Sequence, residues 1–178
     1  MYPRMVVRET IGDIFSVAFA PDGETIAAAG VREDEDGEKH RGIFLWNISE
    51  ADDISSTPVV NTHGDVVFSL EYSPDGRYFA TGASNGTVRL CNATDNSSAI
   101  LMTSNGSTVY SWVAFSPNGK ILASASVDGS VRLWSVEDGG DGSCLIELLG
   151  HHEGGAYSVA FSPDGQTIAS IEAISQPP

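Results

Sequence analysis

Apolar and polar residues alternate in four short stretches of this 178-residue chain. In residues 15–20, phenylalanine and valine occupy every second position, with serine or alanine between them. A period of two residues is typical of a β-strand with one heavier apolar face. Closely related stretches return at residues 68–73, 112–116 and 157–162. The pattern therefore predicts four similar strands along the chain.

The same turn follows each of these strands. It reads Pro-Asp-Gly three times and Pro-Asn-Gly once, with prolines at Pro21, Pro74, Pro117 and Pro163. Proline presets φ for the first turn position, and glycine accepts the left-handed conformation that closes a hairpin. The prolines lie 53, 43 and 46 residues apart. A period of this length indicates a solenoid, a propeller or another repeat array.

Further short apolar runs complete each period. Second strands are expected at residues 25–29, 78–83, 121–125 and 167–170, third strands at 42–47, 87–92 and 130–135, and fourth, outermost strands at 59–62, 100–103 and 145–149. Residues 5–10 are predicted to form a lone outer strand. Four strands per period make a propeller blade, so the chain is predicted to be all-β.

The third unit carries the most complete motif. Residues 113–134 read Val-Ala-Phe-Ser-Pro-Asn-Gly-Lys-Ile-Leu-Ala-Ser-Ala-Ser-Val-Asp-Gly-Ser-Val-Arg-Leu-Trp. This unit resembles a WD40 repeat, and Gly150-His151 resembles the Gly-His dipeptide that precedes a first strand in that family. Four in-phase copies extend the resemblance over nearly the whole chain. It implies an array of WD40-type β-propeller blades that serves as a non-catalytic protein–protein interaction scaffold.

The repeat units predict one domain, residues 1–178. The outer strand at 5–10 precedes blade 1 at about 13–62, blade 2 at about 65–104, blade 3 at about 108–149 and a partial blade 4 at about 155–171. This strand count does not close a ring, so we expect an open arc of about 3.5–4 blades. Three explanations fit, in this order: a fragment or truncated product of a larger propeller without autonomous function, a half-propeller that self-associates through its open blade edges, or a compact four-bladed ring.

The resemblance also implies a polar set that braces each blade. It consists of a His before strand one, a Ser or Thr on strand two, an Asp in the next turn and a Trp on strand three. Ala28 replaces the hydroxyl residue in the first unit, Cys91 replaces the tryptophan in the second, and no unit holds a complete set. We therefore expect each polar contact to contribute only about 0.5–1.5 kcal/mol beside the sheet packing. The matching residues are His63, Thr81, Ser124, Asp128, Trp134, Trp46, His151 and Ser170.

An acidic extension in the first unit is a candidate partner-binding segment. The turn proline and the strand-three residue lie 25 positions apart in this unit, against 17 in the second and third units. The eight additional residues fall between strands two and three. They form either a contact for a basic partner or a solvated loop. The candidate residues are Glu33, Asp34, Glu35 and Asp36.

Trp112 is a second candidate for partner binding. Counted back from the turn proline, it occupies the position that serine holds in the other three units, at Ser16, Ser69 and Ser158. A large aromatic residue at this position is either an anchor for a partner or a local packing change.

The charge and composition of the chain limit the kinds of partner that it can bind. The chain holds 24 acidic and 9 Lys or Arg residues, a formal net charge of −15. This charge repels nucleic acid and anionic membranes and favours a basic protein surface. No apolar stretch approaches the roughly 20 residues of a membrane helix, and residues 1–8 lack the apolar core of a signal peptide. With Cys91 and Cys144 interpreted as free thiols, an intracellular protein, cytoplasmic or nuclear, is predicted.

Catalysis is the alternative function, through hydrolytic or metal-assisted chemistry in a propeller channel. It needs convergent His, Asp or Glu residues on the first strands, and Glu71 is the only acidic residue there. The residues that suggest a nucleophilic triad match the bracing set, and no Gly-x-Ser-x-Gly elbow accompanies them. Adjacent residues of an extended segment point to opposite faces, so residues 151–153 do not form a metal site. No catalytic residue, metal or cofactor is predicted.

Overall fold

The computed structural model describes residues 12–33, 36–48, 56–59, 64–95, 97–102, 111–137, 144–148 and 154–172, which form fourteen β-strands in four antiparallel sheets. We number the sheets blade 1 to blade 4. Blade 1 contains β1 (Ile14–Phe19), β2 (Thr25–Glu33), β3 (Lys39–Asn47) and β4 (Ser56–Val59). Blade 2 contains β5 (Val67–Tyr72), β6 (Tyr78–Ala83), β7 (Val88–Asn92) and β8 (Ser98–Met102). Blade 3 contains β9 (Ser111–Phe115), β10 (Ile121–Ser126), β11 (Val131–Ser135) and β12 (Cys144–Leu148), and blade 4 contains β13 (Ala156–Phe161) and β14 (Ile168–Glu172). The lone outer strand predicted at 5–10 lies outside the described residues.

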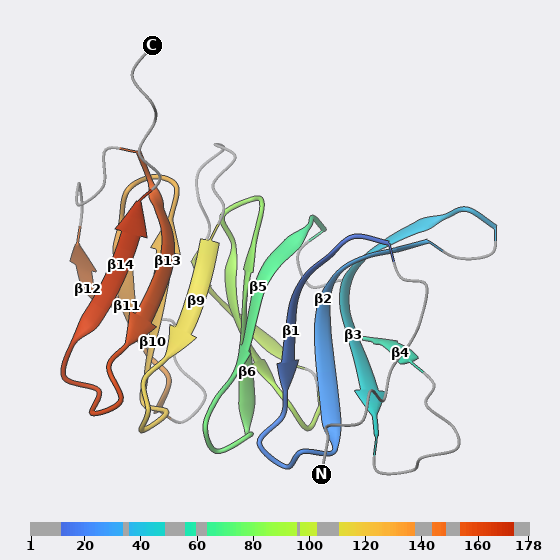
Figure 1. Ribbon diagram of the computed structural model, residues 1–178, viewed down its shortest axis with the longest axis horizontal. Helices are drawn as coiled ribbons and strands as arrows, with labels where there is room; N and C mark the ends of the chain where they lie inside the picture. Colours follow the sequence, from blue (N-terminus) through green and yellow to red (C-terminus); the bar gives the residue numbers. More distant parts are fainter. Residues whose placement is uncertain are drawn as a thin grey trace, which may run out of the picture.

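The blades stand side by side in an open arc (Figure 1). Strands follow one another in chain order within each sheet. Neighbouring blades meet through their first strands, because β1 contacts β5, β5 contacts β9 and β9 contacts β13. Blades 1 and 4 lie at opposite ends of the arc. The structure thus confirms the predicted all-β fold and the open arrangement of the blades.

Repeated turns join strands one and two along one side of the arc. The glycines of the four turns have φ between 69° and 72°, which explains why glycine recurs there. A Cβ atom built on Gly76 would lie 3.5 Å from Pro21, and one on Gly119 would lie 3.5 Å from Pro74. The turns of blades 2, 3 and 4 therefore each pack against the turn proline of the preceding blade.

Apolar clusters between the sheets form the core. One joins blades 1 and 2, another joins blades 2 and 3, and a third joins blades 3 and 4. A fourth cluster, formed by Ile26, Ala28, Phe44 and Trp46, lies on the face of blade 1 that points away from blade 2. Burial of these side chains supplies the main favourable contribution to folding.

The largest differences from the predicted strand bounds lie in blade 1. Strands β2 and β3 are each nine residues long, because the additional residues of the first unit continue the ladder through the pairs Val31–Arg41, Arg32–His40 and Glu33–Lys39. The fourth strand of blade 1 is described over residues 56–59, in register with Ile43 to Trp46, and residues 60–62 of the predicted strand 59–62 lie outside the described residues. Pro58 lies within this strand. An outer strand tolerates proline, which has no N–H to donate, because one edge of such a strand needs no hydrogen-bond partner.

The first strands carry a feature that the alternating pattern did not predict. In β1, β5 and β13 the register shifts at one residue, which leaves Phe15, Phe68 and Tyr157 as β-bulges. Strand β9 pairs with β10 without a shift. A bulge redirects a side chain, and the three bulged residues are aromatic. Blade 3 is therefore the one described blade that has no bulge in its first strand.

Candidate functional site

The acidic extension forms a two-stranded ribbon that projects from blade 1 (Figure 1). Its stem is built from the ends of β2 and β3, where Glu33 pairs with Lys39 and Arg32 with His40. Glu33 and Asp36 are exposed, and Gly37 turns the chain with φ 81°. Asp34 and Glu35 lie outside the described residues. The structure therefore shows a paired hairpin stem with basic residues among the acidic ones, and among its described residues Glu33, Asp36 and Glu38 are exposed.

Trp112 packs between blades 3 and 4. Its ring centroid lies 5.3 Å from that of Tyr157, with an angle of 52° between the planes. A similar contact joins blades 1 and 2, where the rings of Phe15 and Phe68 lie 4.7 Å apart. Trp112 is half-buried, so part of its indole faces solvent. It is the second residue of β9, which starts on the same upper side of the arc in Figure 1 as the ribbon of blade 1.

The predicted bracing residues make different contacts in each blade. In blade 3 the Trp134 indole donates a hydrogen bond to the Ser124 hydroxyl at 2.9 Å. Asp128 instead accepts from the Ser130 backbone at 2.9 Å and forms an ion pair with Arg132 at 3.2 Å. Burial raises the pKa of Asp128, but the hydrogen bonds from Ser130 and the nearby Arg132 lower it by more. The contacts of Asp128 with Ser130 and Arg132 thus stabilise the turn and do not extend the hydrogen bond between Trp134 and Ser124.

Blades 1 and 2 use other residues at these positions. Trp46 is buried, and its indole nitrogen has no hydrogen-bond partner because Ala28 replaces the serine. In blade 2 the Thr81 hydroxyl bonds to the buried Cys91 thiol, whose pKa is raised to about 12 mainly by burial. Ser170 lies half-buried on β14. His63 and His151 lie outside the described residues.

Glu71, the acidic residue on the first strands, bridges blades 2 and 3. Its carboxylate accepts a hydrogen bond from the backbone N–H of Phe115 at 3.0 Å. Burial raises its pKa, and the bond from Phe115 opposes that shift. The equivalent residues on the other first strands are Ala18, Ala114 and Ala160. Sequence reasoning noted Glu71 only as an isolated acid and missed this contact, although the departure from alanine was visible in the repeat.

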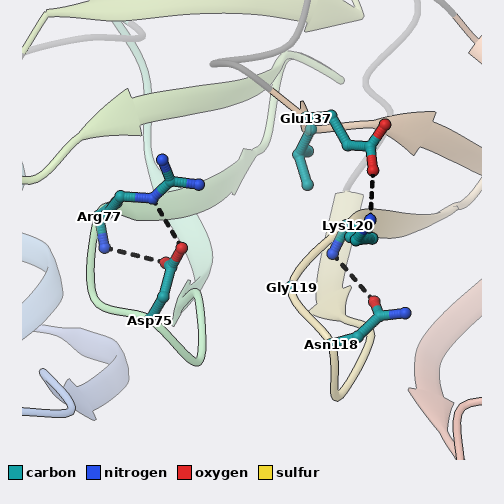
Figure 2. A pocket seen from close by; sticks show the side chains of 7 residues that line it. Asp75, Arg77, Asn118, Gly119, Lys120 and Glu137 are labelled. Carbon is teal, nitrogen blue, oxygen red and sulfur yellow. Dashed lines mark hydrogen bonds and ion pairs between the residues drawn. The ribbon is translucent and has the colours of Figure 1, made fainter.

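A polar hollow of about 370 Å³ lies between the turns of blades 2 and 3. Figure 2 shows that its cations are each held by a neighbouring carboxylate. Arg77 pairs with Asp75 at 2.7 Å and Lys120 pairs with Glu137 at 2.8 Å. Hydrogen bonds from Ser73 and Arg77 lower the pKa of Asp75 to about 2. The hollow is lined by Asp75, Arg77, Asn118, Gly119, Lys120, Val136 and Glu137.

The described part of the chain contains no group of three or more His, Cys, Asp or Glu residues that could hold a metal ion. None of the described residues belongs to a helix long and apolar enough to cross a membrane.

Four-stranded antiparallel sheets that stack through their first strands define a repeat protein of the β-propeller type. The family model described as WD domain, G-beta repeat (WD40) matches residues 55–92, 97–135 and 142–170, more than half of the chain. The chain belongs to the WD40 repeat family, whose members are in general non-catalytic scaffolds for protein–protein interactions. Comparison with curated proteins found no match.

The matched ranges do not coincide with single sheets. The first range begins at residue 55 and ends at 92, so it covers β4 of blade 1 and β5 to β7 of blade 2. The second covers β8 to β11 in the same way. Each sequence repeat therefore ties two neighbouring blades together. Strands β1 to β3, which carry the acidic extension, lie outside the matched ranges.

Proposed function

We propose that this chain is a non-catalytic interaction scaffold that binds a basic protein surface through the ribbon of blade 1. The observation that carries the proposal is the projecting hairpin, on which the carboxylate residues Glu33, Asp36 and Glu38 are exposed. Cross-strand pairing through Glu33 and Lys39 holds the stem, so less conformational entropy is lost on binding than for an unstructured loop. The net charge of −15 adds long-range attraction for a basic partner.

Trp112 is a second proposed contact. Its half-buried ring offers an aromatic surface beside Tyr157, and large aromatic residues are common anchors at protein interfaces. Trp46 and Trp134 are 2% and 4% exposed, so a solvent quencher reaches mainly Trp112. A partner that covers Trp112 reduces acrylamide quenching of the intrinsic fluorescence. Quenching that does not change at saturating partner would remove Trp112 from the interface.

The ribbon is tested by fluorescence anisotropy with a labelled Lys- and Arg-rich peptide. One variant carries Glu33→Gln, Asp34→Asn, Glu35→Gln and Asp36→Asn, which removes four charges and keeps the shapes of the side chains. We expect its affinity to fall by about tenfold, equivalent to about 1.4 kcal/mol. Unchanged affinity would exclude the ribbon as the binding site.

A matched control separates the ribbon from the overall charge of the chain. It replaces four exposed glutamates elsewhere, Glu24, Glu137, Glu147 and Glu172, by glutamine and so removes the same number of charges. The proposal predicts that this control retains most of the affinity. Equal losses in the two variants would mean that the peptide responds only to net charge.

We further propose that the arc works as part of a larger propeller, within an intracellular protein. Closed propellers hold four to eight blades, and the fourth blade has two strands among the described residues. Cys144 is an exposed free thiol and Cys91 a buried one, a state usual for intracellular proteins.

A further inference from the structure

The three interfaces within the arc share one construction. At its centre, strand two of each of the first three blades presents an alanine, and strand one of the next blade presents a larger side chain. The small residue at the centre of strand two is Ala27, Ala80 or Ala123, and each is 0% exposed. The facing residues in the next blade include Leu70, Val113 and Val159, which are 5% to 8% exposed. Every interface is therefore heterologous, with a small face against a large face.

The two ends of the arc leave one face of each kind open. On β1, Val17 is 65% and Phe19 is 61% exposed, whereas their counterparts in blade 3, Val113 and Phe115, are 7% and 6% exposed. At the other end, Ala160 on β13 and Ala169 on β14 are exposed. Blade 1 thus presents exposed large side chains on β1, and blade 4 presents exposed small side chains on β13 and β14.

Hydrogen bonds between blades follow the same direction. The Ser16 hydroxyl accepts a bond from the Leu70 N–H at 3.2 Å and donates to the Leu70 carbonyl at 3.3 Å. The Ser69 hydroxyl accepts from the Val113 N–H at 3.2 Å. Ser158 is the equivalent serine of blade 4, and Val17 is the equivalent of Leu70 and Val113. The open small face therefore carries a serine in the position that binds the backbone of a following large face.

We propose that the small face of blade 4 in one copy of this chain docks on the large face of blade 1 in a second copy, so that two copies close a ring of eight sheets. Ala160 and Ala169 then cover Val17 and Phe19, and the Ser158 hydroxyl meets the Val17 N–H. Eight sheets lie within the four to eight blades of closed propellers. The inference rests on the proposed role of the arc as part of a larger propeller, and it identifies the remainder as a second copy.

The burial of Ile26, Phe44 and Trp46 confines this docking to the first strand of blade 1. Contacts between the blades of one chain run mainly from strands one and two of one blade to strand one of the next: β1 and β2 contact β5, β6 contacts β9 and β10 contacts β13. The matching surface on blade 1 is β1, and this is the strand whose large side chains are exposed. Inside the arc the large face also includes strands two and three, as Leu122 and Trp134 show in blade 3. Their counterparts in blade 1, Ile26 and Trp46, are already buried, so the second copy docks on β1 alone.

Sedimentation velocity on the 178-residue chain tests the proposal. We expect a species of twice the 18.8 kDa chain mass at tens of micromolar protein. Because burial of apolar surface favours pairing while the like charges of two acidic chains oppose it, added salt should tighten the dimer. Binding of the basic peptide should instead weaken with salt. A monomer at all salt concentrations, or a series of assemblies larger than two, would overturn the proposal.

Two single variants place the contact. Phe19→Glu on the large face and Ala160→Glu on the small face should each weaken dimerisation by at least tenfold. Both residues are exposed in the monomer, so the fold should tolerate the changes. Ile100→Glu is the control, because Ile100 is 49% exposed on the outer strand of blade 2 and the change adds the same charge. If Ile100→Glu weakens the dimer as strongly, the assigned face is wrong.

Mixing the two variants tests the head-to-tail direction. The Phe19→Glu copy keeps an intact small face, and the Ala160→Glu copy keeps an intact large face, so the mixture should form dimers through one undamaged interface. A mixture that stays monomeric while the wild type dimerises would contradict the proposal. Peptide binding that persists in a monomeric wild type would leave the scaffold proposal standing while this inference fails.

Discussion

The indole N–H of Trp134 donates to the hydroxyl of Ser124 across 2.9 Å, a contact that blade 1 has lost. Both tryptophans are buried and both occupy the same register, since Trp134 pairs with Leu122 and Trp46 with Ile26. Ala28 takes the place of Ser124, so the Trp46 nitrogen is left without an acceptor. The two blades therefore form a natural comparison of the same indole with and without its hydrogen bond.

Restoring the missing acceptor should stabilise the chain. We expect Ala28→Ser to raise the free energy of unfolding by about 0.5–1.5 kcal/mol, the net contribution of one hydrogen bond. Urea denaturation measures the change. Ala27→Ser is the control, because Ala27 points into the interface with blade 2, and a hydroxyl there should destabilise. A loss of stability in Ala28→Ser equal to that of the control would contradict this account of Trp46.

Removing the existing acceptor should have the opposite effect. Ser124→Ala leaves the Trp134 N–H buried without a partner, and we expect a loss of about 1–3 kcal/mol in the same urea experiment. Asp128→Ala should cost less, since Asp128 is bound to the turn and to Arg132 instead of the indole. A neutral Ser124→Ala would show that the contact contributes nothing to stability.

The sequence predicted most of the strands because alternation, turn prolines and turn glycines are local signals. Strand β6 was placed correctly at Tyr78–Ala83, and the first strands and their turns follow the predicted positions closely. The bulges at Phe68 and Tyr157 were not predicted, because a bulge depends on how the facing strand pairs. The bridge from Glu71 to Phe115 was missed for a similar reason, since it joins two blades 44 residues apart in sequence.

Glu71 makes stability depend on pH. Its pKa is raised in the folded chain, so the folded state binds the proton more tightly and loses stability as the pH rises above the unfolded value of 4.5. Glu71→Gln removes this loss, and its amide oxygen can still accept from Phe115. We expect the stability of the variant relative to the wild type to increase as the pH rises above 4.5 and to level off once Glu71 is ionised in the folded wild type. Urea titrations across this range would refute the account if the advantage instead shrank with rising pH.

Trp112 and Tyr157 should be energetically coupled. A double-mutant cycle with Trp112→Ala and Tyr157→Ala should give a coupling of about 0.5–1.5 kcal/mol, the usual value for an aromatic pair. Tyr157→Phe keeps the ring and should change stability little. Additive losses in the cycle would mean that the ring contact does not hold blade 4 against blade 3.

Gly155 should be far less tolerant of substitution than Gly23. Both have positive φ, at 88° and 72°. A Cβ on Gly155 would lie 2.8 Å from the Val127 carbonyl oxygen, whereas a Cβ on Gly23 would meet nothing within 4 Å. We expect Gly23→Ala to cost about 1–2 kcal/mol from backbone strain alone, and Gly155→Ala to cost more than that. Thermal unfolding of the two variants gives the comparison, and equal losses would contradict it.

The most direct test of the proposed function is the salt dependence of binding to the Lys- and Arg-rich peptide. The slope of log Kd against log salt concentration measures how much charge is neutralised on binding. We predict a steep slope for the wild type and a clearly shallower one for the variant with amides at residues 33–36, while the control with four glutamates replaced elsewhere keeps a slope close to that of the wild type. Equal slopes for the wild type and the ribbon variant would contradict the assignment of the blade 1 ribbon as the binding site.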